Sequence, residues 1–114
     1  MVLVIGGAGQ GKLDFAKKTL HVTAWSENPL GPEDCIYGLH QFVRECPDAK
    51  RFVREWCAEH PQGVIICDEV GCGVTPLDRA ERDWREAVGR LCCELAEQAE
   101  AVYRVSCGLG VRIK

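Results

Sequence analysis

The stretch "VLVIGGAGQGKLDFA", residues 2–16, decides the fold because it places an apolar run, a glycine-rich loop and a helical pattern in direct succession. The four apolar residues from Val2 to Ile5 are typical of a buried strand. Residues 6–12 then match the spacing G-x-x-x-x-G-K, in which backbone N–H groups surround phosphate oxygens and the lysine adds a positive charge. We therefore predict a phosphate-binding loop between the first strand and the first helix.

The residue after the loop lysine departs from this pattern. Leu13 stands where a serine or threonine hydroxyl normally binds magnesium. We expect phosphate binding to survive, and metal-dependent transfer to need water, Asp68 or Thr23 as the ligand instead. An ordinary glycine turn with a surface lysine is the alternative, and the flanking strand and helix patterns argue against it. The predicted nucleotide-binding residues of this segment are Gly6, Gly7, Ala8, Gly9, Gln10, Gly11, Lys12 and Leu13.

Strand and helix patterns alternate along the rest of the chain. We expect strands at residues 2–5, 20–25, 63–67 and 101–107, and helices at 11–20, from 35 to the break at Pro47, 49–60 and 77–99. The run at 63–67 is apolar throughout, as in a central parallel strand. The class is therefore α/β: a three-layer fold like that of P-loop NTPases, with a mostly parallel sheet flanked by helices. We treat residues 1–114 as one domain with a helical middle segment at about 34–60.

The composition narrows the possible partners and the compartment. Lys and Arg number 14 against 17 Asp and Glu, and they are spread along the chain, so nothing in the charge pattern indicates a nucleic-acid partner. We find no apolar stretch long enough for a membrane span and no secretion signal before the glycine loop, and we expect a cytoplasmic protein. In that compartment the eight cysteines are expected to be free thiols.

Two acidic residues follow the apolar run at residues 63–67. Asp68 and Glu69 are expected at the carboxyl end of that strand, on the same edge of the sheet as the phosphate loop. Asp68 is the candidate metal ligand for Mg2+, and Glu69 is the candidate group that orients or deprotonates an attacking atom. The alternative is that the pair is solvated or caps the next segment.

Four segments in the same order resemble the cobinamide kinase and cobinamide-phosphate guanylyltransferase family of vitamin B12 synthesis. They are "GGAGQGK" (6–12), "DEVGCGVTP" (68–76), "RDWREAVGR" (82–90) and "CGLGVRIK" (107–114). The resemblance covers about residues 1–24 and 63–114, and family members are longer in the region between. It carries Gly6, Gly7, Ala8, Gly11 and Lys12 over to nucleotide binding, Glu69, Val70, Gly71, Gly73 and Pro76 to the loop after the acidic strand, and Arg85, Gly89 and Arg90 to a helix motif.

The resemblance also implies particular chemistry and partners. It implies GTP or ATP as the nucleotide, a corrinoid substrate and a homo-oligomer. In the family a histidine of the middle region takes GMP from GTP, and among His21, His40 and His60 the position of His40 fits this role best. A histidine without chemistry is the alternative for His40. Arg85 and Arg90 are the helix residues that the resemblance connects with the nucleotide, whereas a solvated charged helix face is the alternative.

Two functional hypotheses follow. The first is an enzyme that phosphorylates cobinamide, transfers GMP to cobinamide phosphate, or does both, with Lys12, Glu69 and His40 as catalytic residues. The second is a nucleotide-binding module that has lost catalysis and keeps a regulatory or assembly role. A different small P-loop kinase is a more distant reading, because the segments at 68–76 and 107–114 would then match by coincidence.

Overall fold

The computed structural model describes residues 1–71 and 77–114, and it confirms the order of elements around the phosphate loop. Strand β1, Val2–Gly6, leads through the loop into helix α1, Lys12–Thr19. Leu3 and Val4 are both buried, although they face opposite sides of the sheet. This two-sided burial explains the continuous apolar run, because a central parallel strand is covered on both faces.

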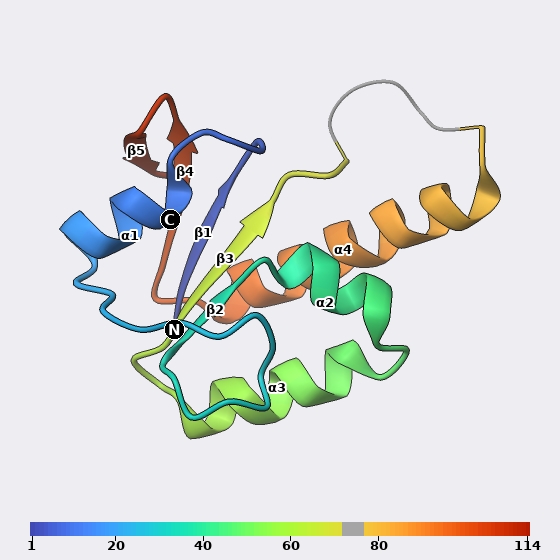
Figure 1. Ribbon diagram of the computed structural model, residues 1–114, viewed down its shortest axis with the longest axis horizontal. Coiled ribbons are helices and arrows are strands. Elements are labelled where there is room, and N and C mark those ends of the chain that lie inside the picture. Colours follow the sequence, from blue (N-terminus) through green and yellow to red (C-terminus); the bar gives the residue numbers. More distant parts are fainter. Residues whose placement is uncertain (72–76) are drawn as a thin grey trace.

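Five strands form one sheet in the order β2-β3-β1-β4-β5 (Figure 1). The added strands are β2 (Cys35–Tyr37), β3 (Val64–Asp68), β4 (Ala101–Ser106) and β5 (Leu109–Arg112). The first four strands pair in parallel, and β5 pairs antiparallel with β4. The fold is therefore α/β with a mostly parallel sheet, as predicted. Because Gly6 is in register with Asp68, the loop after β1 and the acidic end of β3 share one edge.

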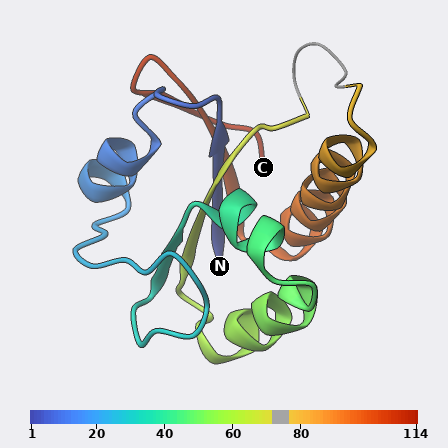
Figure 2. The same ribbon diagram turned by 45° about the vertical axis from the view of Figure 1, so that its right-hand side comes forward.

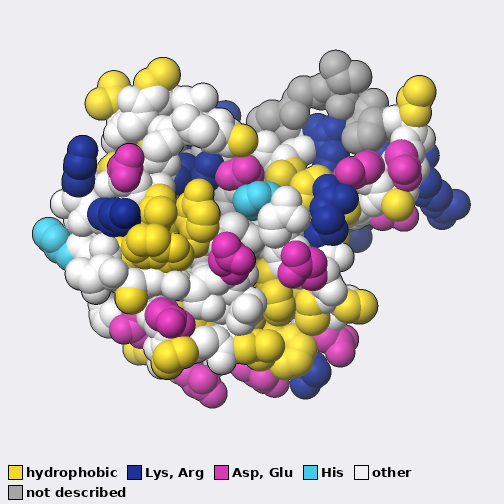
Figure 3. All heavy atoms as spheres, in the orientation of Figure 1, with side chains coloured by type: hydrophobic (Ala, Val, Ile, Leu, Met, Phe, Trp, Pro, Cys, Tyr) yellow, Lys and Arg dark blue, Asp and Glu magenta, His cyan; other side chains and the backbone are white. Residues whose placement is uncertain are grey.

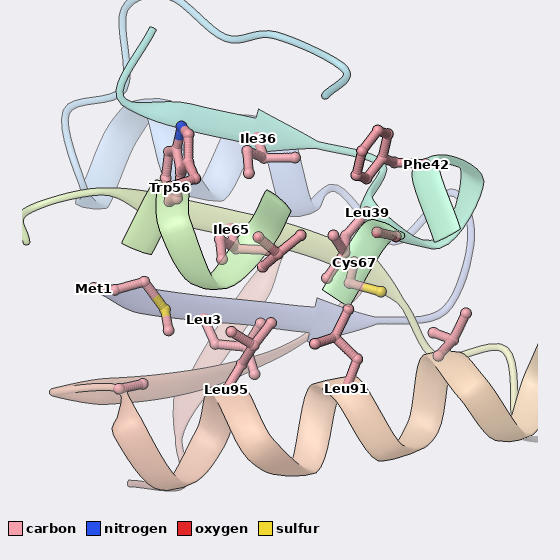
Figure 4. Packing of buried hydrophobic residues seen from close by; sticks show 14 of the residues in the cluster. Met1, Leu3, Ile36, Leu39, Phe42, Trp56, Ile65, Cys67, Leu91 and Leu95 are labelled. Atoms are coloured by element: carbon pink, nitrogen blue, oxygen red, sulfur yellow. The ribbon is translucent and has the colours of Figure 1, made fainter. Parts of the chain in front are cut away.

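Helices cover both faces of this sheet (Figure 2). Helix α1 lies on one face, where Phe15 and Ala16 pack against Val4 and Val105. Helices α2 (Leu39–Glu45), α3 (Ala49–Glu59) and α4 (Arg79–Gln98) lie on the other. Figure 4 shows the larger core beneath them, where Leu91 and Leu95 of α4 face Leu3 and Cys67.

Two sequence predictions around residues 20–38 are wrong. Residues 20–25 form no strand, and His21 lies there with a φ of 59° in place of the extended backbone expected of it. The second strand is Cys35–Tyr37 within the segment predicted as helix, so the middle is not helical throughout. Its Cys35 and Ile36 are buried by pairing with β3 and packing on the core. That tertiary pairing overrides a local spacing that also fits a helix.

The carboxyl-terminal part departs from the predictions in two details. The helix predicted at 77–99 begins at Arg79, capped by Asp78, so Leu77 precedes it and is exposed. The apolar stripe of that helix is confirmed by burial of Val88, Leu91 and Leu95. Strand β5, which was not predicted from the sequence, follows a tight turn at residues 107 and 108.

Charged side chains of both signs are interspersed on the face in Figure 3, including the end of α4 that projects from the body. None of the helices in the described ranges is long and apolar enough to cross a bilayer. The seven cysteines within those ranges are free thiols, as predicted, and Cys72 lies outside them. Burial raises the pKa of the Cys35 thiol to about 12. The thiols of Cys67 and Cys92 lie 3.7 Å apart between β3 and α4.

Candidate nucleotide-binding site

A cavity of about 620 Å³ opens at the carboxyl edge of the sheet, beside the phosphate loop. Residues 8–14 line one side of it, and Asp68 at the end of β3 also lines it. The opposite side comes from β2 and α2. The residues on that side are Tyr37, Gly38, His40, Gln41, Phe42 and Glu45. The cavity therefore has a phosphate-loop wall, residues 8–14, and an α2 wall, residues 37–45.

The phosphate-loop wall has the backbone conformation that its glycines permit. Gly9 and Gly11 have φ angles of 70° and 85°, in the left-handed region that is unfavourable for residues other than glycine. Gly11 is also the N-cap of α1, so the unpaired N–H groups of the first helical turn are next to the loop. Helix N-termini attract anions through these N–H groups and through the helix dipole. The loop is therefore shaped for an anionic group.

Gln10 ties the loop to the turn between β4 and β5. Its side-chain Oε1 accepts a hydrogen bond from the Cys107 N–H at 2.8 Å, and its backbone carbonyl accepts one from the Gly108 N–H at 2.7 Å. A Cβ on Gly11 would lie 3.1 Å from the Cα of Gly108, so the two turns are in close contact. The sequence reading missed this contact because 97 residues separate Gln10 from Cys107.

Lys12 projects from the start of α1 into the site. Its side chain is 6% exposed, and Nζ lies 2.7 Å from Asp68 Oδ1. The same ammonium group donates to the Gly7 carbonyl at 2.7 Å. An ammonium group has three N–H donors, so these two contacts leave one for a ligand. Contacts with Asp68 and Gly7 therefore hold the ammonium group in the site, and its role in binding phosphate remains a prediction.

Asp68 joins Lys12 to His40. Its Oδ2 atom lies 3.4 Å from His40 Nε2, and its backbone N–H donates to His40 Nδ1 at 3.2 Å. Because Nδ1 accepts that hydrogen bond, the neutral imidazole carries its proton on Nε2, toward the carboxylate. Burial lowers the pKa of His40, the charge of Asp68 partly opposes this, and Lys12 and Arg44 lower it further. The predicted catalytic residues Lys12 and His40 thus meet at one carboxylate.

Glu69 does not line the cavity. Its backbone N–H donates to the Gly6 carbonyl at 2.9 Å, and its carboxylate pairs with Arg104 at 3.1 Å. Successive side chains of a strand point to opposite faces, which separates Glu69 from Asp68 at the end of β3. A catalytic role for Glu69 remains a prediction.

Arg85 and Arg90 lie on α4, and neither is among the described residues that line the cavity. Arg90 is exposed and pairs with Glu86 one turn earlier on the helix. A nucleotide-binding role for these arginines remains a prediction. Gly73 and Pro76 of the acidic loop lie outside the described residues.

The other side chains considered from sequence lie elsewhere. Thr23, offered as a replacement hydroxyl, is exposed and lines a different hollow. His21 lines that same hollow, and His60 stacks on Trp56 with ring centroids 4.5 Å apart. Among the three histidines, the structure brings His40 to the phosphate loop.

Magnesium fits these residues poorly. Leu13 offers no ligand atom, and the Asp68 carboxylate is already engaged by Lys12 and His40. Across residues 1–71 and 77–114, no group of three or more His, Cys, Asp or Glu side chains is placed to hold a metal ion. A hard, six-coordinate cation needs several oxygen ligands, so this part of the chain does not supply a cage of its own.

The α2 wall contains polar residues that the sequence reading missed. Tyr37, Gln41 and Glu45 border the cavity, and Glu27 approaches it from the loop before β2. Tyr37 was missed because the segment from residue 35 was predicted as one helix, whereas Tyr37 ends strand β2. For Gln41, Glu45 and Glu27 no local motif marks a binding role. The four side chains offer hydroxyl, amide and carboxylate groups to a bound molecule.

Helix α2 is held by contacts with α4 on the side away from the cavity. The indole Nε1 of Trp84 donates to the His40 carbonyl at 2.8 Å. The guanidinium of Arg44 stacks on the Trp84 ring at 3.7 Å and bonds both carboxylate oxygens of Glu81, at 3.1 and 3.0 Å. We call these four residues, His40, Arg44, Glu81 and Trp84, the α2–α4 contact.

Comparison with known proteins gives this geometry a context. The bifunctional adenosylcobalamin biosynthesis proteins CobU of Salmonella typhimurium and of Escherichia coli are each 41% identical to this chain over 51 residues. The matched stretch is 45% of this chain and 28% of each relative, so it spans less than a third of their length.

A profile of the family described as cobinamide kinase / cobinamide phosphate guanyltransferase matches residues 21–113. That match begins after the phosphate loop. The loop motif and its geometry are therefore observations separate from the profile match. The profile spans most of the chain, and together with the two relatives it confirms the resemblance: this protein belongs to the cobinamide kinase / cobinamide phosphate guanyltransferase family.

Proposed function

We propose that this protein binds a nucleoside triphosphate in the cavity and transfers a phosphoryl or guanylyl group to a cobinamide substrate. Family membership supports a nucleotide-binding role in cobalamin biosynthesis. The observation that carries the proposal is the meeting of Lys12, Asp68 and His40 beside the phosphate loop. Phosphate chemistry needs a positive charge and a reactive or orienting group at one place, and this cavity holds both.

The phosphate loop and Lys12 would hold the triphosphate. Backbone N–H groups around Gly9 and Gly11 and the N-terminus of α1 favour negative charge. The remaining N–H of Lys12 would donate to a phosphate oxygen and stabilise charge that develops during transfer. Leu13 offers Mg2+ no ligand atom and the Asp68 carboxylate is already paired, so we expect nucleotide affinity to depend weakly on Mg2+.

His40 would act as the acceptor in guanylyl transfer. A ring nitrogen attacks the α-phosphorus of GTP, the bond to the bridging oxygen breaks, and pyrophosphate leaves. A phosphate oxygen of cobinamide phosphate then attacks the same phosphorus and releases the imidazole. Both ring nitrogens of His40 are engaged by Asp68, so the ring must give up one of these contacts before it attacks.

A labelling experiment tests this role. The protein is incubated with GTP labelled at the α-phosphate, and acid-labile label on the chain is measured. We expect label on the wild type and on His21→Asn, whose exposed side chain lies outside the cavity, and none on His40→Asn. Label retained in His40→Asn would exclude His40 as the acceptor.

The kinase reaction is tested separately, by phosphorylation of cobinamide with ATP or GTP. A protein that binds nucleotide but shows neither label nor cobinamide phosphorylation would be the catalytically inactive binding module. The corrinoid substrate and homo-oligomeric assembly belong to this proposal as well, and native mass measurement tests the assembly.

A further inference from the structure

We propose that Trp84 is a positioning residue for His40, acting through the backbone of α2 from the neighbouring helix. The inference rests on the proposed role of His40 and adds to it a residue 44 positions away in the chain. Trp84 is absent from the cavity lining in the described part of the molecule, so its effect must pass through the α2–α4 contact.

His40 is anchored at two points by two different elements. Its imidazole meets Asp68 at the end of β3, and its carbonyl accepts the indole N–H of Trp84 from α4 at 2.8 Å. The first anchor fixes the ring, and the second fixes the backbone that carries the ring. When the ring leaves Asp68 to attack a phosphate, the Trp84 hydrogen bond still holds the His40 carbonyl. Burial of Leu39 and Phe42 also keeps α2 on the core.

Helix α2 needs such an anchor because it is weak on its own. It has seven residues, and its N-cap Gly38 makes no side-chain capping hydrogen bond. Isolated helices of this length are not stable in water, so tertiary contacts must hold the helix in place. Catalytic geometry tolerates little displacement, and a shift of about 1 Å costs on the order of a hundredfold in rate.

The surroundings of Trp84 favour a fixed position for its indole. The Arg44 guanidinium covers one face of the ring at 3.7 Å, and Glu81 holds that guanidinium in turn. A cation stacked on an aromatic ring is attracted to it, and the paired carboxylate keeps the cation in place. The indole donor is therefore directed at the His40 carbonyl by contacts from both helices.

The chain provides a matched control for removing this donor. Trp84→Phe keeps an aromatic ring beneath Arg44 and deletes the N–H. Trp56→Phe makes the same change on α3, where the buried indole nitrogen has no hydrogen-bond partner among the described residues. A difference between the two variants therefore reports the hydrogen bond to His40 in particular.

The first measurement is the rate at which GMP from GTP labels the protein in a single turnover. We expect Trp84→Phe to label about threefold to tenfold more slowly than Trp56→Phe, with the Kd for GTP within twofold of the wild type. Equal labelling rates in the two variants would overturn the proposal. So would a loss of GTP affinity as large as the loss of rate, since that indicates a general structural role.

The second measurement does not depend on catalysis. The imidazole Cε1–H resonance of His40, assigned with His40→Asn, is compared in the two variants by NMR. We expect it to shift or broaden in Trp84→Phe and to stay at the wild-type position in Trp56→Phe. If the wild type takes no label, the acceptor role of His40 fails, and this spectrum still decides whether Trp84 positions His40. An unchanged His40 resonance in Trp84→Phe would overturn the positioning role of Trp84.

Discussion

The two walls of the cavity are built in different ways. The phosphate-loop wall is a continuous segment whose shape comes mainly from its own glycines and the start of α1, with two hydrogen bonds to Gln10 from the β4–β5 turn. The α2 wall begins on a three-residue strand, continues into a seven-residue helix, and is held by Trp84 and Asp68 from distant parts of the chain. One wall is mainly a product of local sequence, and the other depends on tertiary contacts.

This difference separates two tasks within one site. Holding a polyphosphate requires backbone N–H groups in a fixed arrangement, which a short glycine-rich segment can supply. Placing a reactive side chain requires a second secondary-structure element at a defined distance from the phosphate loop. Residues that are close together in the sequence cannot fix that distance. Changes in the first wall should therefore affect nucleotide binding most, and changes in the second should affect transfer.

Of the changes proposed, removing the positive charge of Lys12 from the phosphate-loop wall should have the largest effect, and that effect should be on GTP binding. Lys12→Met removes the ammonium group that faces the cavity, and a charge-assisted hydrogen bond contributes about 1.5–3 kcal/mol. We expect GTP to bind about tenfold to a hundredfold more weakly, as measured by calorimetry. Lys17→Met is the control, since Lys17 is exposed and lies over the Trp25 ring at 4.7 Å. Similar affinities in both variants would show that Lys12 does not hold phosphate.

Glycine substitutions should separate the conformation of the loop from its contact with the β4–β5 turn. Gly9→Ala and Gly11→Ala both force alanine into the left-handed region, at a cost of about 1–2 kcal/mol each. The new methyl group meets no atom within 4 Å at Gly9 but lies 3.1 Å from the Gly108 Cα at Gly11. We therefore expect Gly11→Ala to lower the free energy of unfolding by about 1 kcal/mol more than Gly9→Ala does. Urea denaturation measures both, and equal losses would contradict a tight contact between the turns.

A change of pH is expected to have a smaller effect, on the free energy of unfolding, through His40 of the α2 wall. The folded-state pKa of His40 is lowered, so the unfolded chain binds more protons at this residue as the pH falls. Its contribution to stability is therefore present above the unfolded-state pKa of about 6.5 and declines as the pH falls through that value. We expect the stability difference between the wild type and His40→Gln to narrow from pH 8 to pH 5, as followed by urea denaturation. A difference that widens toward acid would mean that folding raises the pKa of His40.

The sequence was informative where local patterns decide the structure. The apolar run at 2–5, the loop glycines and the helix beginning at Lys12 lie close together, and their spacing alone predicts strand, loop and helix. The same holds for Asp68, which follows an apolar run that became β3. The meeting of Lys12 and Asp68 then follows from parallel pairing of β1 and β3.

The α2 wall could not be predicted in the same way. Ile36, Leu39 and Phe42 have helical spacing, yet Ile36 belongs to a strand because it pairs with β3 and packs into the core. The indole of Trp84 reads as part of an apolar helix stripe, and nothing in its spacing indicates a bond to the His40 carbonyl. Both features depend on partners distant in sequence, which periodicity does not report.

The hydrogen bonds from Cys107 and Gly108 to Gln10 have a consequence for biosynthesis. During translation the residues of the phosphate loop leave the ribosome long before the β4–β5 turn is made. Until that turn arrives, the nascent loop lacks two of its hydrogen bonds, and β1 lacks its neighbour β4. We therefore expect nucleotide capture to begin only after the β4–β5 turn at residues 107 and 108 has emerged, so the loop matures well after its own residues are synthesised.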